Sequence, residues 1–285
     1  MLPSDFAVII PTHGRYDRVH TVGSLRKSGY TGPIYLLCDD EDKQLDQYKE
    51  KYGDKVLVFS KGDYAGKFDK MDNFGNKACV VYARNAMWDT ARSVGLKYFA
   101  VADDDYTSYS FKMDEKQCYR TNLQIKNMDK VFSAYLEFLI ESNIDTVCFA
   151  QDGDYIGGFN NSKISGGYKP YRKMMNLYFF HSDKPIEFKG TINEDLTSSV
   201  TEGSKGAKII TCMLTSLKQK ETQSNAGGLT DIYLELGTYV KSFYSVIAAP
   251  SCVKVAAMGV SSLRLHHAVT WKNAVPKIIR QEQKK

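Results

Sequence analysis

Apolar residues in the first half of the chain gather into short runs that alternate with charged segments. Three runs, Phe6 to Thr12, Ile34 to Cys38 and Val56 to Phe59, have the length of buried parallel strands. The charged segment from about Asp42 to Tyr52 lies between the second and third runs and ends at a glycine, which is typical of a helix. These runs predict the first strands of a sheet and a helix that connects two of them.

The clearest helical pattern follows a segment, 61–73, that is rich in Gly, Asp and Lys and that we expect to be a loop. Apolar residues recur at spacings of three and four from Val80 to Val94, and Gly95 follows them. The next apolar run, Lys97 to Ala102, predicts a strand directly after this helix.

A further helix and strand complete the alternation. The apolar pattern predicts a helix from about Asn127 to Glu141 and a strand from Thr146 to Ala150. Alternating strands and helices are typical of an α/β fold with a doubly wound, mainly parallel sheet. In such folds the ligand site lies beyond the carboxyl ends of the strands.

The composition changes after Gln151. Residues 153–171 are rich in Gly and Tyr and show weak periodicity, and the remainder mixes short strands with loops. We therefore expect residues 1–150 to form a Rossmann-like half and residues 151–285 a mixed α+β lobe, joined in one continuous domain.

The composition excludes several classes of protein. Of the 285 residues, 43% are apolar and 25% are charged, as in a globular protein with a large core rather than a fibrous or disordered one. Pro250 and Lys254 interrupt the most apolar late segment, and the first residues lack the basic start and long apolar run of a secretory signal. We expect no membrane span.

Six widely spaced cysteines include no C-x-x-C pair, which predicts buried free thiols and a reducing, cytoplasmic location rather than a structural zinc site. The net charge of +5 is concentrated at the C-terminus, because residues 271–285 hold five basic residues and one acid. This tail is either a solvated surface or a site for an anionic partner.

Three adjacent carboxylates, Asp103, Asp104 and Asp105, end the strand predicted at Lys97 to Ala102. Such carboxylates repel one another unless cations neutralise them, and oxygen ligands favour Mg²⁺ or Mn²⁺. In an extended chain Asp103 and Asp105 share a face and are the candidate metal ligands. The alternative is an acidic turn exposed to solvent.

Three passages together resemble nucleotide-sugar glycosyltransferases of the GT-A fold. The block from Ala83 to Tyr109, ARNAMWDTARSVGLKYFAVADDDYTSY, resembles their A-R-N, helix, strand and D-x-D passage. The segment IIPTHGR, Ile9 to Arg15, is similar to their first strand and P-T-x-x-R turn. The second predicted strand ends in Cys38-Asp39-Asp40-Glu41, where such enzymes commonly place an acid on the uracil or ribose.

The resemblance implies that residues 1–150 bind a nucleoside-diphosphate sugar, with Asp105 and Asp103 on Mn²⁺ or Mg²⁺. The triple Asp leaves the register of the D-x-D open. Arg15 and Arg84 have ordinary salt bridges as an alternative role, and Asp39 a helix N-cap. The implied donor-binding residues are Thr12, Arg15, Asp39, Arg84, Asp103 and Asp104.

GT-A enzymes often add a late histidine as a third metal ligand. His266 and His267 end a candidate strand, where neighbouring side chains point to opposite faces, so we expect at most one of them to bind the metal. The alternative is that both are structural.

An inverting transfer needs a base that takes the proton of the acceptor hydroxyl. The segment Thr191 to Thr197 resembles the E-D element of inverting members, with Asp195 as the first candidate base and Glu194 as the second. The competing interpretation is a plain helix start, capped by Asn193 with acids in its first turn. Retention of configuration would need no such base.

The second half suits DNA as the acceptor. Tyrosines interleave with basic residues over 155–178, a pattern that holds extruded or single-stranded bases. The elements Gln223 to Tyr233 and His266 to Arg280 resemble those of phage TET-associated glycosyltransferases, which act on hydroxymethylated pyrimidines. That resemblance implies host cytoplasm as the location and a DNA phosphate role for Lys272, Lys277 and Arg280.

Three alternatives stay open on the sequence. A GT-A transferase acting on a polysaccharide or protein would be indifferent to DNA. A non-catalytic nucleic-acid-binding protein with a GT-A shell would bind DNA without turnover. A nucleotidyltransferase would release diphosphate from a nucleoside triphosphate.

Overall fold

The computed structural model describes residues 2–75, 77–116, 118–155, 168–169, 172–220, 233–234, 237, 239–258 and 263–274. Lys277 and Arg280, which we expect to contact DNA phosphates, lie outside these ranges.

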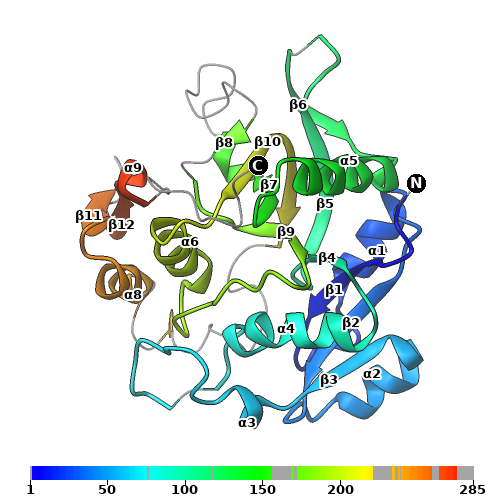
Figure 1. Cartoon of the computed structure of the whole chain (residues 1–285), viewed down its shortest axis with the longest axis horizontal. Coiled ribbons are helices and arrows are strands. Elements are labelled where there is room, and N and C mark those ends of the chain that lie inside the picture. The colour runs from blue at the N-terminus through cyan, green and yellow to red at the C-terminus, as the bar shows by residue number, and fades with distance from the viewer. Residues whose placement is uncertain are drawn as a thin grey trace.

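A central sheet runs through the molecule in the order β3-β2-β1-β4-β9-β7-β10-β5-β6, with β8 paired to β10 (Figure 1). Its first four strands are mutually parallel and were all predicted from the apolar runs. They are β1 (Phe6–Pro11), β2 (Ile34–Asp39), β3 (Val56–Phe59) and β4 (Tyr98–Val101).

The rest of the sheet mixes directions. β9 lies antiparallel between β4 and β7, β10 is parallel to β7, and β5 is antiparallel to both β10 and β6. These strands are β5 (Tyr106–Met113), β6 (Tyr119–Gln124), β7 (Thr146–Gln151), β8 (Tyr168–Lys169), β9 (Asn176–His181) and β10 (Ile209–Gln219). The predicted α/β class, with a GT-A-like doubly wound and mainly parallel sheet, is confirmed.

Helices cover both faces of this sheet, which is what a doubly wound topology requires. Helices α1, α2 and α5 pack on one face, while α3 and α4 pack on the other. Their bounds are α1 (His20–Lys27), α2 (Leu45–Tyr52), α3 (Lys61–Tyr64), α4 (Val81–Ser93) and α5 (Met128–Glu141). Single turns of 3-10 helix occur at Gly53–Lys55 and Asp152–Tyr155.

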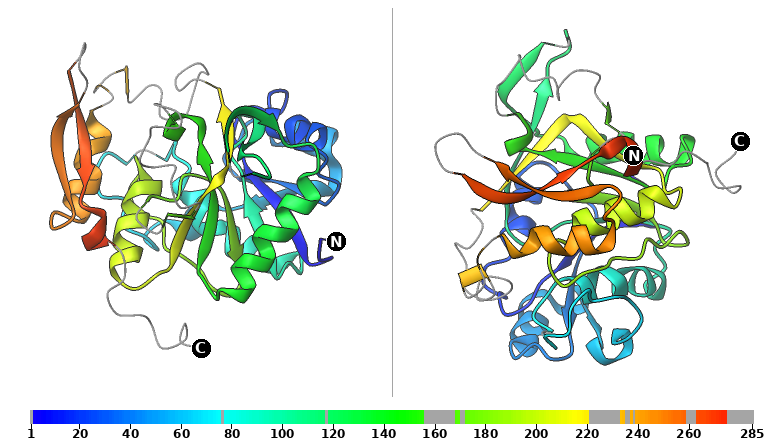
Figure 2. Two further views of the ribbon diagram at one scale, coloured as in Figure 1. Left: turned by 90° about the horizontal axis from the view of Figure 1, so that it is seen from above. Right: turned by 90° about the vertical axis from the view of Figure 1, so that its left-hand side faces the viewer.

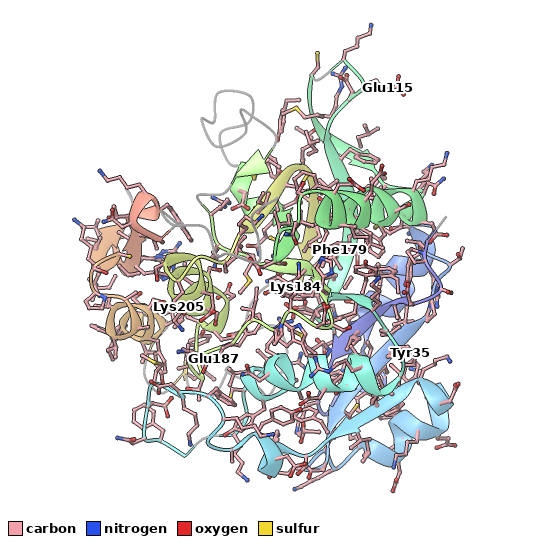
Figure 3. All side chains as sticks on the ribbon, in the orientation of Figure 1. Tyr35, Glu115, Phe179, Lys184, Glu187 and Lys205 are labelled. Carbon is pink, nitrogen blue, oxygen red and sulfur yellow. The ribbon has the colours of Figure 1, made fainter. Side chains whose placement is uncertain are left out.

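Strand β1 explains why the apolar runs are unbroken. Phe6, Val8 and Ile10 belong to the core beneath α5, whereas Ala7 and Ile9 belong to the core beneath α4. A strand buried on both faces needs apolar residues at every position. On β9, Phe179 stacks on Phe6 with ring centroids 6.1 Å apart, deep inside the molecule (Figure 3).

The predicted helices α4 and α5 begin and end within one residue of their expected bounds. The expectation of a loop over 61–73 is wrong at its start, because α3 begins at Lys61. Lys61 is buried there, since its charge is paired with the acid that ends β2.

A smaller group of elements lies beside α6 at one end of the molecule (Figure 2). Helices α8 and α9 and the antiparallel ribbon β11–β12 pack around α6 in their own small core. A Cβ atom on Gly203 would lie 2.3 Å from the carbonyl oxygen of Ala274, so this packing requires glycine. The bounds are α6 (Glu194–Ser204), α8 (Val240–Ala248), α9 (Trp271–Ala274), β11 (Val253–Met258) and β12 (Arg264–Val269).

All six cysteines are free. Cys38, Cys148, Cys212 and Cys252 are buried, but the expectation that every thiol is buried is wrong, because Cys118 is exposed at the β5–β6 turn. In the part of the chain that the structure describes, no helix has the length and apolar character that crossing a membrane requires.

Candidate active site

The three aspartates form the turn between β4 and β5, at the carboxyl end of the parallel strands. Thr21 of α1 fastens this turn, because its hydroxyl donates to the carbonyl oxygen of Asp103 at 2.5 Å and accepts from the amide of Tyr106 at 2.9 Å. The expectation of an extended D-x-D is therefore wrong, since Asp104 and Asp105 lie in a turn. Each carboxylate consequently meets different neighbours.

Two of the three carboxylates are neutralised by the predicted arginines. Arg84 forms a buried ion pair with Asp103, and Arg15 Nη1 lies 2.9 Å from Asp104 Oδ1. The hydroxyl of Thr12 donates to Asp104 Oδ2 at 2.9 Å. Burial raises the pKa of Asp104, against the opposing effect of Arg15. The structure thus brings together five of the six residues predicted to bind the donor.

Asp105 has no hydrogen bond or ion pair from its carboxylate to any described residue. Burial and the charges of Asp103 and Asp104 raise its pKa to about 7. Three carboxylates thus meet two arginines, so one negative charge remains to be neutralised when all three are ionised. A divalent cation is suited to that task.

Asp39 ends β2 and is held by two basic side chains. Lys61 Nζ lies 2.9 Å from its Oδ1, and His13 Nδ1 lies 2.6 Å from its Oδ2. Burial opposes ionisation, yet the hydrogen bonds from His13 and Lys61 hold the pKa of Asp39 below its usual value. Asp39 is not the N-cap of α2, because that helix begins only at Leu45.

His13 and Lys61 are site residues that the sequence analysis missed. His13 follows Thr12 directly within the P-T-x-x-R turn, so its position in the motif was an available signal. Its ring is half-exposed, and the hydrogen bond to Asp39 raises the pKa of His13. Because Asp39 is ionised and only accepts, His13 Nδ1 is the donor.

Arg84 connects the aspartate turn to the beginning of α6. Its side chain is 2% exposed, its Nε lies 3.9 Å from Glu194 Oε1, and the ring of Tyr178 lies 4.9 Å from its guanidinium carbon. The hydroxyl of Tyr106 donates to Asp103 Oδ2 at 3.2 Å. This burial excludes an ordinary surface salt bridge as the role of Arg84. Through this one arginine, the predicted E-D element is connected to the aspartates predicted to bind the metal.

The candidate bases differ in their surroundings. Glu194 is buried, and burial together with the charge of Asp195 raises its pKa, which Arg84 opposes. Asp195 accepts from Lys173 Nζ at 3.1 Å and is partly exposed. The side chain of Asn193 makes no capping hydrogen bond and instead donates to Ser245 at 2.7 Å. The helix start of the competing interpretation is confirmed, with both acids in the first turn of α6, but the side-chain cap that it assigned to Asn193 is absent.

Tyr233 adds a hydroxyl near these acids. Burial and the charges of Glu194 and Asp195 raise the pKa of Tyr233. This tyrosine ends the Gln223 to Tyr233 element that resembles the phage enzymes, while positions 223–232 of that element lie outside the described residues.

His266 and His267 lie on β12, where the charges of Lys173 and Lys241 act on both rings. Their ring centroids are 4.1 Å apart, so the expectation that they point to opposite faces is wrong. The cause is local, because His266 Nδ1 turns toward the carbonyl oxygen of His267 at 3.1 Å. Among the described residues no three His, Cys, Asp or Glu side chains form a metal-binding group.

The tyrosines expected to stack on bases are partly unavailable. Tyr155, in the 3-10 turn after β7, and Tyr178, on β9, are both buried, so their rings cannot meet a ligand base and that part of the prediction is wrong. Lys272 is exposed on α9, where a phosphate could reach it. Its predicted partners Lys277 and Arg280 lie outside the described part of the chain.

Comparison with known proteins gives the class and then the family. Solved glycosyltransferases are similar in fold. TarS 1-349 of S. aureus, in complex with UDP-GlcNAc, is 14% identical. The match covers 85% of this chain and 66% of that protein, with a TM-score of 0.45. Mannosyltransferase PcManGT from Pyrobaculum calidifontis, in complex with GDP-Man and Mn²⁺, is 11% identical. The match covers 87% of this chain and 74% of that protein, with a TM-score of 0.44. GalNAc-T7 with UDP, GalNAc and Mn²⁺ is 13% identical. The match covers 75% of this chain and 43% of that protein, with a TM-score of 0.43.

No curated protein sequence matches the chain significantly. The sheet topology, with the acidic turn at its rim, is that of the GT-A fold. A model of the TET-associated glycosyltransferase family matches residues 6–228, which is most of the chain. The chain belongs to that family, and the resemblance noted in its sequence is confirmed.

Proposed function

We propose that this protein transfers a sugar from a nucleoside-diphosphate sugar, with a UDP-sugar as the expected donor, to the hydroxyl of a 5-hydroxymethylated pyrimidine in DNA. The observation that carries the proposal is the family match over residues 6–228, together with the acidic turn at the carboxyl end of β4. Both the donor half and the Glu194–Asp195 element lie within the matched range.

The rim of the parallel strands supports the donor side of the proposal. Thr12, His13 and Arg15 follow β1, Asp39 ends β2, and the aspartate turn follows β4. Parallel strands bring these ends to one edge, which is where doubly wound sheets bind nucleotides. The ion pairs Arg15–Asp104 and Arg84–Asp103 hold the turn in one shape before the donor binds.

The residues present fit a divalent cation held by Asp105. Mg²⁺ and Mn²⁺ are commonly bound through one or two carboxylates plus substrate phosphates, so a complete cage of protein ligands is not required. Asp105 supplies free oxygens, and Asp103 lies in the same turn. When bound, the cation would stabilise negative charge on the leaving nucleoside diphosphate.

The residues of α6 supply the proton chemistry. An acceptor hydroxyl must lose its proton as it bonds to the anomeric carbon, and a carboxylate within hydrogen-bond reach is a suitable base. Asp195 remains our first candidate because its side chain is partly exposed, whereas Glu194 is buried against Arg84. In this assignment Glu194 and Arg84 orient the first turn of α6 toward the aspartate turn.

The decisive experiment measures donor and acceptor together. The protein is incubated with MnCl₂ or with EDTA, a panel of UDP- and GDP-sugars, and oligonucleotides containing either cytosine or 5-hydroxymethylcytosine. The nucleosides are weighed by mass spectrometry after digestion. We expect one sugar increment on the hydroxymethylated nucleoside, with MnCl₂ and not with EDTA. Sugar transfer to a glycan in place of DNA would refute the acceptor assignment.

A matched pair of variants tests the metal role. Asp105→Asn should abolish the sugar increment, whereas Asp63→Asn, at an exposed position on α3, should keep it. Undiminished transfer by the Asp105 variant would show that another residue binds the cation.

A further inference from the structure

Basic side chains gather where the first turn of α6 meets α8 and the β11–β12 ribbon. Lys173 pairs with Asp195 at 3.1 Å, Lys241 lies in the first turn of α8, and Arg264 begins β12. We call these three residues, with His266 and His267, the basic cluster. The charges of Lys173 and Arg264 both act on Lys241, and those of Lys173, Lys241 and Asp195 act on His267, so the group is compact.

The basic cluster carries more positive charge than its surroundings neutralise. It holds three basic side chains, whereas one carboxylate, Asp195, acts on Lys241 and His267 and is already bonded to Lys173. Lys241 is half-buried and has no hydrogen bond or ion pair to any residue that the structure describes. Burial and the charge of Lys173 lower the pKa of Lys241. The one carboxylate that acts on Lys241, Asp195, is bonded to Lys173, so this half-buried cation is incompletely neutralised and a bound anion would stabilise it.

The histidines add a hydrogen-bonding group to the same place. His267 Nδ1 is buried and has no hydrogen-bond partner among the described residues. A divalent cation bound here would be repelled by Lys173, Lys241 and Arg264, whereas an anion would be attracted by them. The composition of the basic cluster therefore favours an anionic ligand over the metal that the late histidines suggested.

We propose that the basic cluster binds a phosphodiester group of the acceptor DNA, next to the base that receives the sugar. The inference rests on the proposed function and adds a binding site to it. Ammonium and guanidinium groups bind phosphate oxygens through charge-assisted hydrogen bonds, and such contacts set the position of a nucleic acid on a protein.

The position of the cluster favours the acceptor over the donor as the source of the phosphate. Glu194 faces Arg84 and the aspartate turn, whereas its neighbour Asp195 faces Lys173 and the basic cluster. In the proposed function the donor diphosphate is instead held at the aspartate turn, through a cation on Asp105. Asp195, the candidate base, thus contacts the basic cluster, while the residue before it contacts the arginine of the donor side.

The test compares a double variant with a control on the same ribbon. Lys241→Gln with Arg264→Gln removes two cations, and Lys254→Gln removes an exposed lysine of β11. Binding of a fluorescent hydroxymethylated oligonucleotide is measured by anisotropy over a NaCl series, and binding of UDP with MnCl₂ by calorimetry. The double variant should lose about tenfold or more in oligonucleotide affinity, and its slope against log salt should fall by about one to two. UDP affinity should stay unchanged.

Each other outcome overturns the inference in a different way. Loss of UDP affinity with intact DNA affinity would assign the cluster to the donor diphosphate. Unchanged binding of both ligands, or an equal loss in the Lys254 control, would refute a phosphate site there. A wild-type protein that neither binds nor modifies the oligonucleotide would refute the proposed function itself, and the acceptor assignment of the cluster with it. Circular dichroism of the variants verifies their folding.

Discussion

Replacement of Arg84 by methionine tests how the two halves of the site are held together. Arg84 is 2% exposed, ion-paired with Asp103, and 3.9 Å from Glu194. Methionine fills a similar volume beside Tyr178 but leaves both carboxylates without their cation. We expect a large loss in the free energy of unfolding, because an uncompensated buried charge is far more costly than a lost surface contact.

The magnitude follows from the geometry. Two unit charges about 4 Å apart interact by about 4 kcal/mol at an effective dielectric constant of about 20. Asp103, the direct ion-pair partner, acts more strongly on Arg84 than Glu194, whose carboxylate lies 3.9 Å away, although Asp103 is 31% exposed and therefore partly screened. Together these values agree with the range of about 3–5 kcal/mol that is typical when one partner of a buried ion pair is removed. The loss should shrink at pH 5.5, because burial raises the pKa of Glu194 and protonation of that side chain removes its uncompensated charge.

The assay is urea denaturation followed by tryptophan fluorescence, at pH 5.5 and pH 8. Arg92→Met is the control on the same helix, since Arg92 is 45% exposed and pairs with the exposed Asp89. The control should cost about 1 kcal/mol. Equal destabilisation by the two variants, or a loss at Arg84 that does not depend on pH, would refute the role of Arg84 as a buried bridge between the acidic turn and α6.

Three further predictions concern single contacts. His13→Gln should reduce the free energy of unfolding more at pH 5.5 than at pH 9: Asp39 raises the pKa of His13, so the contact contributes fully below the ordinary histidine pKa and is lost as the pH rises through the raised value. Tyr244→Phe should cost about 1–3 kcal/mol in urea denaturation, because the Tyr244 hydroxyl donates to Asp72 at 2.7 Å. Asp105→Asn should raise the stability at pH 8, since the pKa of Asp105 is raised to about 7 and its ionised form is disfavoured in the folded protein.

A control variant and two contradicting results complete these predictions. The control for Tyr244 is Tyr239→Phe. Tyr239 directly precedes α8 and is 48% exposed, so this change should leave the free energy of unfolding nearly unchanged. A His13 effect that is the same at both pH values would contradict the ion pair with Asp39. A destabilised Asp105 variant at pH 8 would mean that its carboxylate has a stabilising partner in the folded protein.

The sequence by itself determined the parallel half of the fold. β1 to β4, α4 and α5 were predicted with nearly correct bounds, because strands buried on two faces need unbroken apolar runs and amphipathic helices need apolar residues at spacings of three and four. The motifs around Arg15, Asp39 and Asp103 were also placed correctly at strand ends, and Arg84 on a helix, since these elements were already predicted from the local pattern.

Only the tertiary structure decided how those residues are paired. The conversion of the D-x-D into a turn depends on Thr21, which is remote in sequence, and the burial of Lys61 depends on Asp39. The insertion of β9 between β4 and β7 likewise brings Tyr178 beneath Arg84. Long-range electrostatic contacts leave no periodic pattern in a single sequence. The partners of each charge, and with them the side on which α6 presents Asp195, therefore became visible only once the chain was folded.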